Sequence, residues 1–167
     1  MFRKSSTIVR CSNTNPFDTS DKDADMTGIT FNSDGTKMFL VGLENDKVYE
    51  YDLCHPYSMG GAKHTKSFSV GNQDNAPQGM AFKTDGTKMF ILGEQRDKVF
   101  AFTLLPAYDV SEETLVYALD ISDQELTPSG IEFSSNGKQM FIVGRNGDEI
   151  NAYGLATAWD ISTANPR

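Results

Sequence analysis

The chain has 167 residues and a formal net charge of −8, from 15 Lys and Arg against 23 Asp and Glu. Nucleic acids and anionic membranes are bound through basic residues that neutralise phosphate, so this charge and the lack of a basic cluster argue against both as partners. No run approaches the roughly 18 apolar residues of a membrane span, and residues 1–7 lack the apolar segment of a secretion signal, so the compartment stays unknown.

A 51-residue repeat organises the sequence. The run GITFNSDGTKMFLVG begins at Gly28, GMAFKTDGTKMFILG begins at Gly79 and GIEFSSNGKQMFIVG begins at Gly130. The interval is 51 residues in both steps, from 28 to 79 and from 79 to 130. We therefore expect one domain, residues 1–167, built of repeats at about 17–67, 68–118 and 119–167.

Each repeat opens with two strands joined by a tight turn. In the first copy a strand is expected at residues 28–32 and a second at 37–41. Between them stands Asp34-Gly35, a strong hairpin signal because glycine accepts a positive φ. The second strand is apolar on both faces, which is typical of a strand covered on both sides.

Two further strands complete the repeat. A third strand is expected at residues 47–53, and a weaker fourth at 66–70, with its counterpart at 117–121. Residues 155–161 could hold at most one helical turn. Four short antiparallel strands in a repeat of about 40 to 50 residues indicate an all-β fold of β-propeller blades, since the repeats of parallel solenoids are shorter.

The phase of the repeat suggests how the blades assemble. Residues 17–19 align with 68–70, so a fourth-type strand is expected at about 11–19, whereas the third repeat stops before its own. Three blades cannot close a ring, and their open faces would be apolar. We expect a six-bladed C2 homodimer in which each N-terminal strand completes the partner's last blade; the alternative is that the chain is part of a longer propeller.

A family resemblance supports the propeller. The run PSGIEFSSNGKQMFIVG from Pro128, and its sister copies, resembles the P-x-G-I-x-F-s-x-D-G-t-k-M-[FY] repeats of bacterial and phage propeller proteins. The runs Tyr108–Ser111 and Trp159–Ser162 resemble the stretch that ends such repeats. More distantly, the chain is similar to NHL, YVTN and gluconolactonase-like six-bladed propellers. The resemblance implies a fold, which by itself does not determine function.

Candidate metal ligands stand in the connections between repeats. Asp21-x-Asp23-x-Asp25 opens like a calcium loop, although Met26 and Asn32 replace its glycine and glutamate. Oxygen ligands suit a hard cation at the mouth of the channel. The candidates are Asp21, Asp23, Asp25, Asp74 and Asp123. The alternative is that they are solvated turn residues, with no cofactor bound.

Other recurring residues are interpreted as structural. The glycines are expected to permit close backbone packing, and the aspartates to cap the turn between the second and third strands by accepting backbone N–H groups. The positions are Gly28, Gly79, Gly130, Asp46, Asp97 and Asp148. The aromatic residues Tyr57, Tyr108 and Trp159 are expected to anchor the loop after the third strand. Cys11 and Cys54 are interpreted as free thiols.

The residues favour a non-catalytic module. The two histidines, His55 and His64, have no counterparts in the other copies, and no nucleophile or zinc motif occurs. The first hypothesis is therefore a ring that binds a partner or builds an assembly, with itself as partner and with a protein or glycan as a further ligand. The alternative is a metal-dependent, gluconolactonase-like hydrolase with ligands such as Asp23, Asn75 and Asp123. A third hypothesis is a surface adhesion module.

Overall fold

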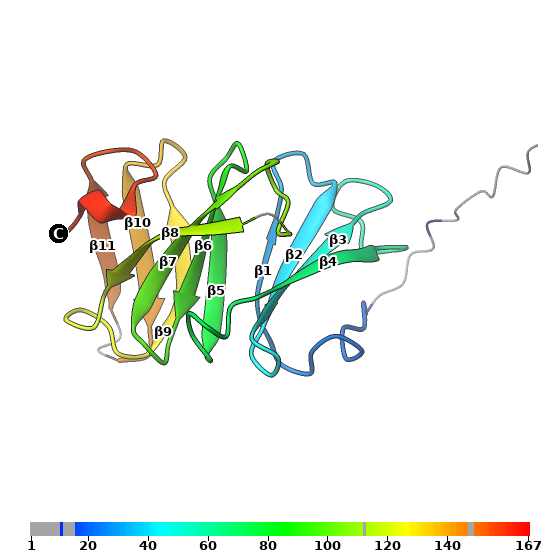
Figure 1. Cartoon of the computed structure of the whole chain (residues 1–167), viewed down its shortest axis with the longest axis horizontal. Helices are drawn as coiled ribbons and strands as arrows, with labels where there is room; N and C mark the ends of the chain where they lie inside the picture. The colour runs from blue at the N-terminus through cyan, green and yellow to red at the C-terminus, as the bar shows by residue number, and fades with distance from the viewer. Residues whose placement is uncertain (1–10, 12–15, 112, 147–148) are drawn as a thin grey trace, which may run out of the picture.

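Three four-stranded antiparallel sheets lie side by side along the long axis of the molecule (Figure 1). The computed structural model describes residues 11, 16–111, 113–146 and 149–167. Blade 1 consists of β1 (Met26–Phe31), β2 (Lys37–Gly42), β3 (Lys47–Asp52) and β4 (Lys63–Ser69). Blade 2 consists of β5 (Pro77–Phe82), β6 (Lys88–Gly93), β7 (Lys98–Leu104) and β8 (Glu113–Asp120). Blade 3 consists of β9 (Pro128–Phe133), β10 (Gln139–Gly144), β11 (Ile150–Leu155) and β12 (Ala164–Pro166), the last preceded by a 3-10 turn, η1 (Ile161–Thr163).

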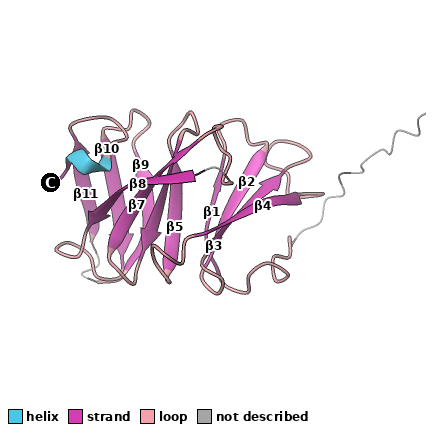
Figure 2. Cartoon of the chain, in the orientation of Figure 1, coloured by secondary structure: helices cyan, strands magenta, loops and turns pink. Residues whose placement is uncertain are grey.

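The all-β architecture predicted from the repeat is confirmed, and strands dominate the described chain (Figure 2). In blade 1 the first three strands lie within two residues of the predicted bounds, while β4 begins three residues earlier than predicted. The stretch 155–161, which could have held one helical turn, contributes only its last residue to the 3-10 turn η1 at Ile161–Thr163. No helix among the described residues is long and apolar enough to cross a membrane.

The fourth strand of blade 3 corrects the expected strand exchange. We expected this blade to stop after its third strand, but β12 pairs with β11 of the same chain, Ala164 opposite Leu155 and Pro166 opposite Tyr153. The η1 turn makes this possible because it reverses the chain, and Asp160 caps it by accepting the N–H of Ser162 at 3.1 Å.

The strand predicted at residues 11–19 is not found in the described part of that range, residues 11 and 16–19; residues 12–15 lie outside the described residues. Phe17 nevertheless packs edge-on against Tyr51, with ring centroids 5.5 Å apart. Phe68 packs in the same way against Phe102, at 5.3 Å. Phe17 therefore occupies, on blade 1, the position that a preceding blade's fourth strand would fill.

Aromatic side chains form the contact between consecutive blades. The ring centroid of Phe39 in blade 1 lies 4.6 Å from that of Phe82 and 6.2 Å from that of Tyr108 in blade 2. One repeat later, Phe90 lies 4.4 Å from Phe133 and 6.4 Å from Trp159. The same junction is thus built twice, and each buries a hydrophobic core between two sheets.

The interpretation of the cysteines as free thiols is wrong. Cys11 and Cys54 form a disulfide, with Cα atoms 6.0 Å apart. Cys11 therefore lies beside the loop after β3, although it stands 43 positions before Cys54 in the sequence. A count of cysteines does not reveal this proximity.

Candidate functional site

The innermost strands of the three blades, β1, β5 and β9, are neighbours in space. A Cβ atom added to Gly28 would lie 3.3 Å from the Cα of Gly79, and one added to Gly79 would lie 3.6 Å from the Cα of Gly130. These glycines therefore let three backbones approach closely. The topology places the loops before each inner strand and after each second strand at one end of the blades, and the turns after each inner strand at the other.

At the loop end, Asp23 is buried and fully hydrogen-bonded. Its Oδ1 accepts the N–H groups of Asp25 and Glu44 at 3.0 and 3.2 Å. Its Oδ2 accepts the N–H of Asn45 at 3.0 Å and the hydroxyl of Tyr49 at 3.3 Å. Burial acts to raise the pKa of Asp23, but the hydrogen bonds outweigh it and hold this pKa below its usual value. Burial and the charge of Asp23 raise the pKa of Tyr49 to about 12.

The same pattern of backbone N–H groups donating to a buried carboxylate recurs in each blade. Asp74 accepts the N–H groups of Ala76, Gln95 and Arg96 at 2.8 to 3.2 Å. Glu125 accepts those of Thr127 and Asn146 at 2.8 and 3.2 Å. Each carboxylate joins the loop before an inner strand to the turn between the next two strands. An acidic residue recurs at 23, 74 and 125, and this recurrence is a sequence signal for the hydrogen-bond pattern. The repeat analysis missed it because residue 125 is glutamate and the other two are aspartate.

The capping expected of Asp46 and Asp97 is therefore carried by other residues. Both aspartates have φ of 50°, and their main-chain carbonyls accept the N–H groups of Val70 and Ile121, each at 2.8 Å. Each keeps a buried Oδ1 without a hydrogen-bond partner. Burial raises the pKa of both carboxyls, and the negative charge of Asp74 raises both further. Asp148, the third position, lies outside the described residues.

The predicted metal ligands do not converge. Asp21, Asp25 and Asp123 are exposed, and Asp21 is paired with Lys22. Asp23 and Asp74 belong to different blades, and their oxygens are occupied by the N–H groups above. Within the described ranges, one set of three His, Cys, Asp or Glu residues has ligand atoms within 4.8 Å of one another, and it is Cys11, Cys54 and His55. The five carboxylates do not fit a calcium ion, so no chemical step is assigned to one.

At the opposite end, a pocket of about 260 Å³ opens between the inner strands of all three blades. Thr30 and Ser33 of blade 1, Lys83 and Thr84 of blade 2 and Glu132 of blade 3 line it with polar groups. The Nζ of Lys83 lies 2.7 Å from Oδ2 of Asp85. Glu132 is exposed, and its Oε1 accepts the N–H of Phe133 at 2.9 Å.

The copies differ where they face this pocket. Threonine, alanine and glutamate stand at the equivalent positions 30, 81 and 132, all of which line the pocket. Lys83 also lines it, whereas its counterparts Asn32 and Ser134 do not. A structural position carries chemically similar residues in every blade, whereas a site with a single set of reacting groups needs different residues in different blades. Sequence reasoning missed Glu132 because it searched for residues that recur.

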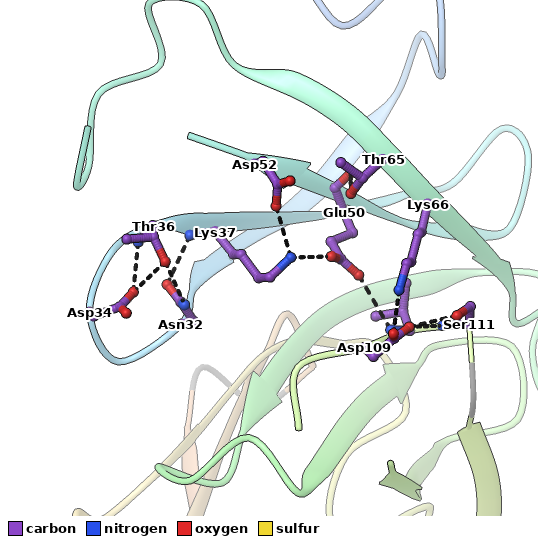
Figure 3. Close-up of polar contacts among 11 residues, drawn as sticks. Asn32, Asp34, Thr36, Lys37, Glu50, Asp52, Thr65, Lys66, Asp109 and Ser111 are labelled. Carbon is purple, nitrogen blue, oxygen red and sulfur yellow. Dashed lines mark hydrogen bonds and ion pairs between the residues drawn. The ribbon is translucent and has the colours of Figure 1, made fainter. Parts of the chain in front are cut away.

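A second polar cluster lies in the seam between blades 1 and 2 (Figure 3). Glu50 is 1% exposed; its Oε1 lies 2.5 Å from the Lys37 ammonium, and its Oε2 accepts the N–H of Val110 at 3.4 Å. Beside it, Lys66 forms an ion pair with Asp109. Burial opposes ionisation of Asp109, but Lys66 and Ser111 lower its pKa to about 2. Glu50 and Lys37 both belong to blade 1, whereas the Lys66–Asp109 ion pair and the hydrogen bond from Val110 to Glu50 cross the seam and hold the two blades together.

Comparison with known proteins places the fold in a family. The family model described as "Lactonase, 7-bladed beta-propeller" matches residues 3–161. The chain belongs to this family of lactonase propellers. No curated protein matches the chain.

Solved structures of lactonase propellers share the fold. A candidate 6-phosphogluconolactonase from Bacteroides fragilis superposes with a TM-score of 0.61 at 16% identity, covering 83% of this chain and 36% of that one. Its counterpart from Bacteroides uniformis gives 0.60 at 16% identity, covering 85% and 39%. The periplasmic gluconolactonase of Pseudomonas aeruginosa gives 0.58 at 14%, covering 83% and 36%. The chain thus spans less than two fifths of the length of these structures.

The family corrects the functional interpretation. A lactonase family and its lactonase neighbours point to a hydrolase, so the non-catalytic module favoured from the sequence is wrong, and the hydrolase alternative is favoured. The lack of a nucleophile motif does not exclude a hydrolase, because a lactone is an ester that water itself can attack, given a base and a group that stabilises the oxyanion. The family description names seven blades, so the expected six-bladed ring is not confirmed.

Proposed function

We propose that the chain forms part of a lactone hydrolase whose substrate binds in the pocket between the three inner strands. The lactonase family match over residues 3–161 carries this proposal. The pocket supports it, because a carboxylate and an ammonium group from different blades, Glu132 and Lys83, line one cavity of about 260 Å³.

The lining suggests a role for each group. Glu132 acts as general base and takes a proton from the water that attacks the lactone carbonyl. Lys83 stabilises the negative charge that develops on the carbonyl oxygen. The tetrahedral intermediate then collapses with cleavage of the ring C–O bond, and the proton passes to the departing alkoxide, which gives an open-chain hydroxy acid.

A hydroxylated lactone suits the lining better than an apolar one. The hydroxyls of Thr30, Ser33 and Thr84 offer hydrogen bonds to ring hydroxyl groups. The neighbours described as gluconolactonases and candidate 6-phosphogluconolactonases are named for sugar lactones. We therefore propose a sugar lactone as the substrate class. Glu132 and Lys83 need no metal ion for the roles described.

Hydrolysis of glucono-δ-lactone, followed by alkali uptake in a pH-stat, tests the proposal. We expect a rate above that of buffer alone, unchanged by a chelator, and at least about tenfold lower in Glu132→Gln, since general-base catalysis contributes roughly 10² to 10⁴. The control is Glu113→Gln, which makes the same change on the outer strand β8. A rate equal to that of buffer alone, or equal rates for the two variants, contradicts the proposal.

A further inference from the structure

The two outermost faces of the three-blade array carry the two halves of the junction that already joins its blades. In both internal junctions, a phenylalanine from the second strand of one blade lies against an aromatic pair of the next blade: Phe39 against Phe82 and Tyr108, and Phe90 against Phe133 and Trp159. The corresponding phenylalanine of blade 3 is Phe141, one repeat beyond Phe90.

Blade 1 holds the matching aromatic pair. The rings of Phe31 and Tyr57 lie 5.3 Å apart, as do those of Phe82 and Tyr108, and those of Phe133 and Trp159 lie 5.2 Å apart. The pair is thus formed in blade 1 without any phenylalanine of another blade resting on it. Tyr57 is 61% exposed. The receptor half of the junction is preformed.

We name these two surfaces by their residues. The donor face of blade 3 consists of Phe141, Val143 and Ile150, and the acceptor face of blade 1 consists of Ile29, Phe31 and Tyr57. A pocket of about 320 Å³ lies beside the donor face, and a pocket of about 370 Å³ lies beside Ile29 of the acceptor face. They lie at opposite ends of the array, since blades 1 and 3 flank blade 2 (Figure 1).

The exposure of these side chains shows what each face lacks. Val143 is 44% exposed, whereas its counterparts Val41 and Leu92 are fully buried at the internal junctions. Ile150 is 71% exposed, and its counterparts Val48 and Val99 are fully buried.

On the acceptor face the contrast is confined to its inner edge, where Ile29 is 55% exposed against 6% for its counterpart Met80, while Met38 and Leu40 are buried like their counterparts Met89 and Ile91. Exposed apolar patches of this kind mark interaction sites. Here the repeat identifies the surface that complements each one.

We propose that the donor face of one chain docks on the acceptor face of a second copy and repeats there the junction between blades. Because the two faces differ, the contact is heterologous, with blade 3 of one copy beside blade 1 of the other, and a second contact of the same kind between the two copies closes the dimer. Phe17 packs on Tyr51 of blade 1, just as Phe68 packs on Phe102 beside the first internal junction. Phe17 therefore leaves the rings of Phe31 and Tyr57 open to a second copy. The contact uses sheet faces and exchanges no strand, and it goes beyond the proposed hydrolase activity.

The mass of the 167-residue chain in solution, measured by light scattering after size exclusion over a range of concentrations, tests this. We expect a dimer of twice 18.4 kDa. Val143→Lys on the donor face and Ile29→Lys on the acceptor face should each give monomers, because a lysine ammonium would be buried without a partner. Leu115→Lys on β8, where the side chain is also 44% exposed, should leave the dimer intact.

Mixing the two monomeric variants separates this contact from general adhesion. Val143→Lys keeps a sound acceptor face and Ile29→Lys keeps a sound donor face, so an equimolar mixture should recover a dimer. Far-ultraviolet circular dichroism checks that both variants are folded. A wild-type monomer at every concentration, a dimer that survives both substitutions, or a mixture that stays monomeric overturns the proposal.

Discussion

Asp23 is a residue whose negative charge the fold requires. Its carboxylate accepts hydrogen bonds from three N–H groups and the Tyr49 hydroxyl. Asp23→Asn replaces an oxygen acceptor with an NH₂ donor facing N–H groups. We expect the free energy of unfolding at pH 7 to fall by about 2 kcal/mol, a typical value for hydrogen bonds to a charged group. Urea unfolding measures it, with the exposed Asp21→Asn as control; similar losses in the two variants would show that burial of the carboxylate is irrelevant.

The acid dependence of this effect has a definite sign. Because the folded state lowers the pKa of Asp23, its stabilisation is fully present above the unfolded pKa of about 3.9 and is lost as the pH falls through the folded value. The difference between wild type and Asp23→Asn should therefore shrink steadily below about pH 4. A difference that stays constant down to the acid transition contradicts this linkage.

The effect of pH on stability has the opposite sign at Asp97, because burial and the negative charges of Asp120 and Asp74 raise the pKa of its carboxyl in the folded state. Ionisation of Asp97 therefore costs stability, and the cost appears as the pH rises from about 3.9 through the folded pKa. Asparagine also tolerates a φ of 50° well. We expect Asp97→Asn to raise the free energy of unfolding at pH 7 by about 0.5 kcal/mol, with no gain below about pH 3.5. A loss at pH 7 contradicts this.

At the scale of elements, the seam between blades 1 and 2 depends on Glu50. Its ion pair with Lys37 is buried on the carboxylate side, whereas Asp52, which also pairs with Lys37, is 56% exposed. Removing one partner of a buried pair is costly, but an exposed pair contributes little. Because Lys37 is 30% exposed and keeps Asp52 as a partner, we expect Glu50→Gln to lower the free energy of unfolding by about 1.5 kcal/mol, a typical value for hydrogen bonds to a charged group, and Asp52→Asn to lower it by less than about 0.5 kcal/mol. Thermal and urea unfolding compare them; equal losses would show that the buried seam contributes nothing special.

The elements also show how far sequence reasoning reaches. The strands β1 to β3 and their counterparts were predicted closely, because an Asp-Gly or Asn-Gly turn and the apolar run 38–41 recur at a fixed interval. The strand β12 was not, because its three residues carry no alternating pattern and pair only after η1 reverses the chain. The disulfide was missed for a similar reason, since it depends on the tertiary path of the segment before β1.

The candidate site was predictable only in part. Asp23 and Asp74 were predicted as metal ligands, and the sequence cannot show that backbone N–H groups already occupy their oxygens. The pocket residue Glu132 stands where the other copies have Thr30 and Ala81, so a search for recurring residues passes over it. Recurrence reveals the architecture, whereas divergence between copies on an inner strand points to the pocket.

Across the whole molecule, the three blades are covered unequally. Blade 2 is packed on both faces, and Phe90, Ile91 and Leu92 on its strand β6 are fully buried. Blade 3 is packed on one face only, and its outer strand β12 pairs with just the last three residues of β11. Local opening is easiest where few apolar contacts must be broken, so the array should open from the blade 3 end.

Hydrogen exchange of dilute protein, read by mass spectrometry, compares two equivalent segments. Val99–Ala101 of β7 pairs with both β6 and β8, whereas Ile150–Ala152 of β11 pairs with β10 on one side only. On its other side, beyond the β12 ladder, the Ala152 carbonyl accepts the N–H of Arg167 at 2.9 Å, which protects no amide of β11. We expect the β11 segment to exchange its amides faster. At high protein concentration, docking of the donor face on a second copy should slow exchange at Ile150–Ala152 and leave Val99–Ala101 unchanged. Equal exchange in the two segments at low concentration would mean that the array opens as one unit. The short pairing of β12 would then not lower the local stability of blade 3.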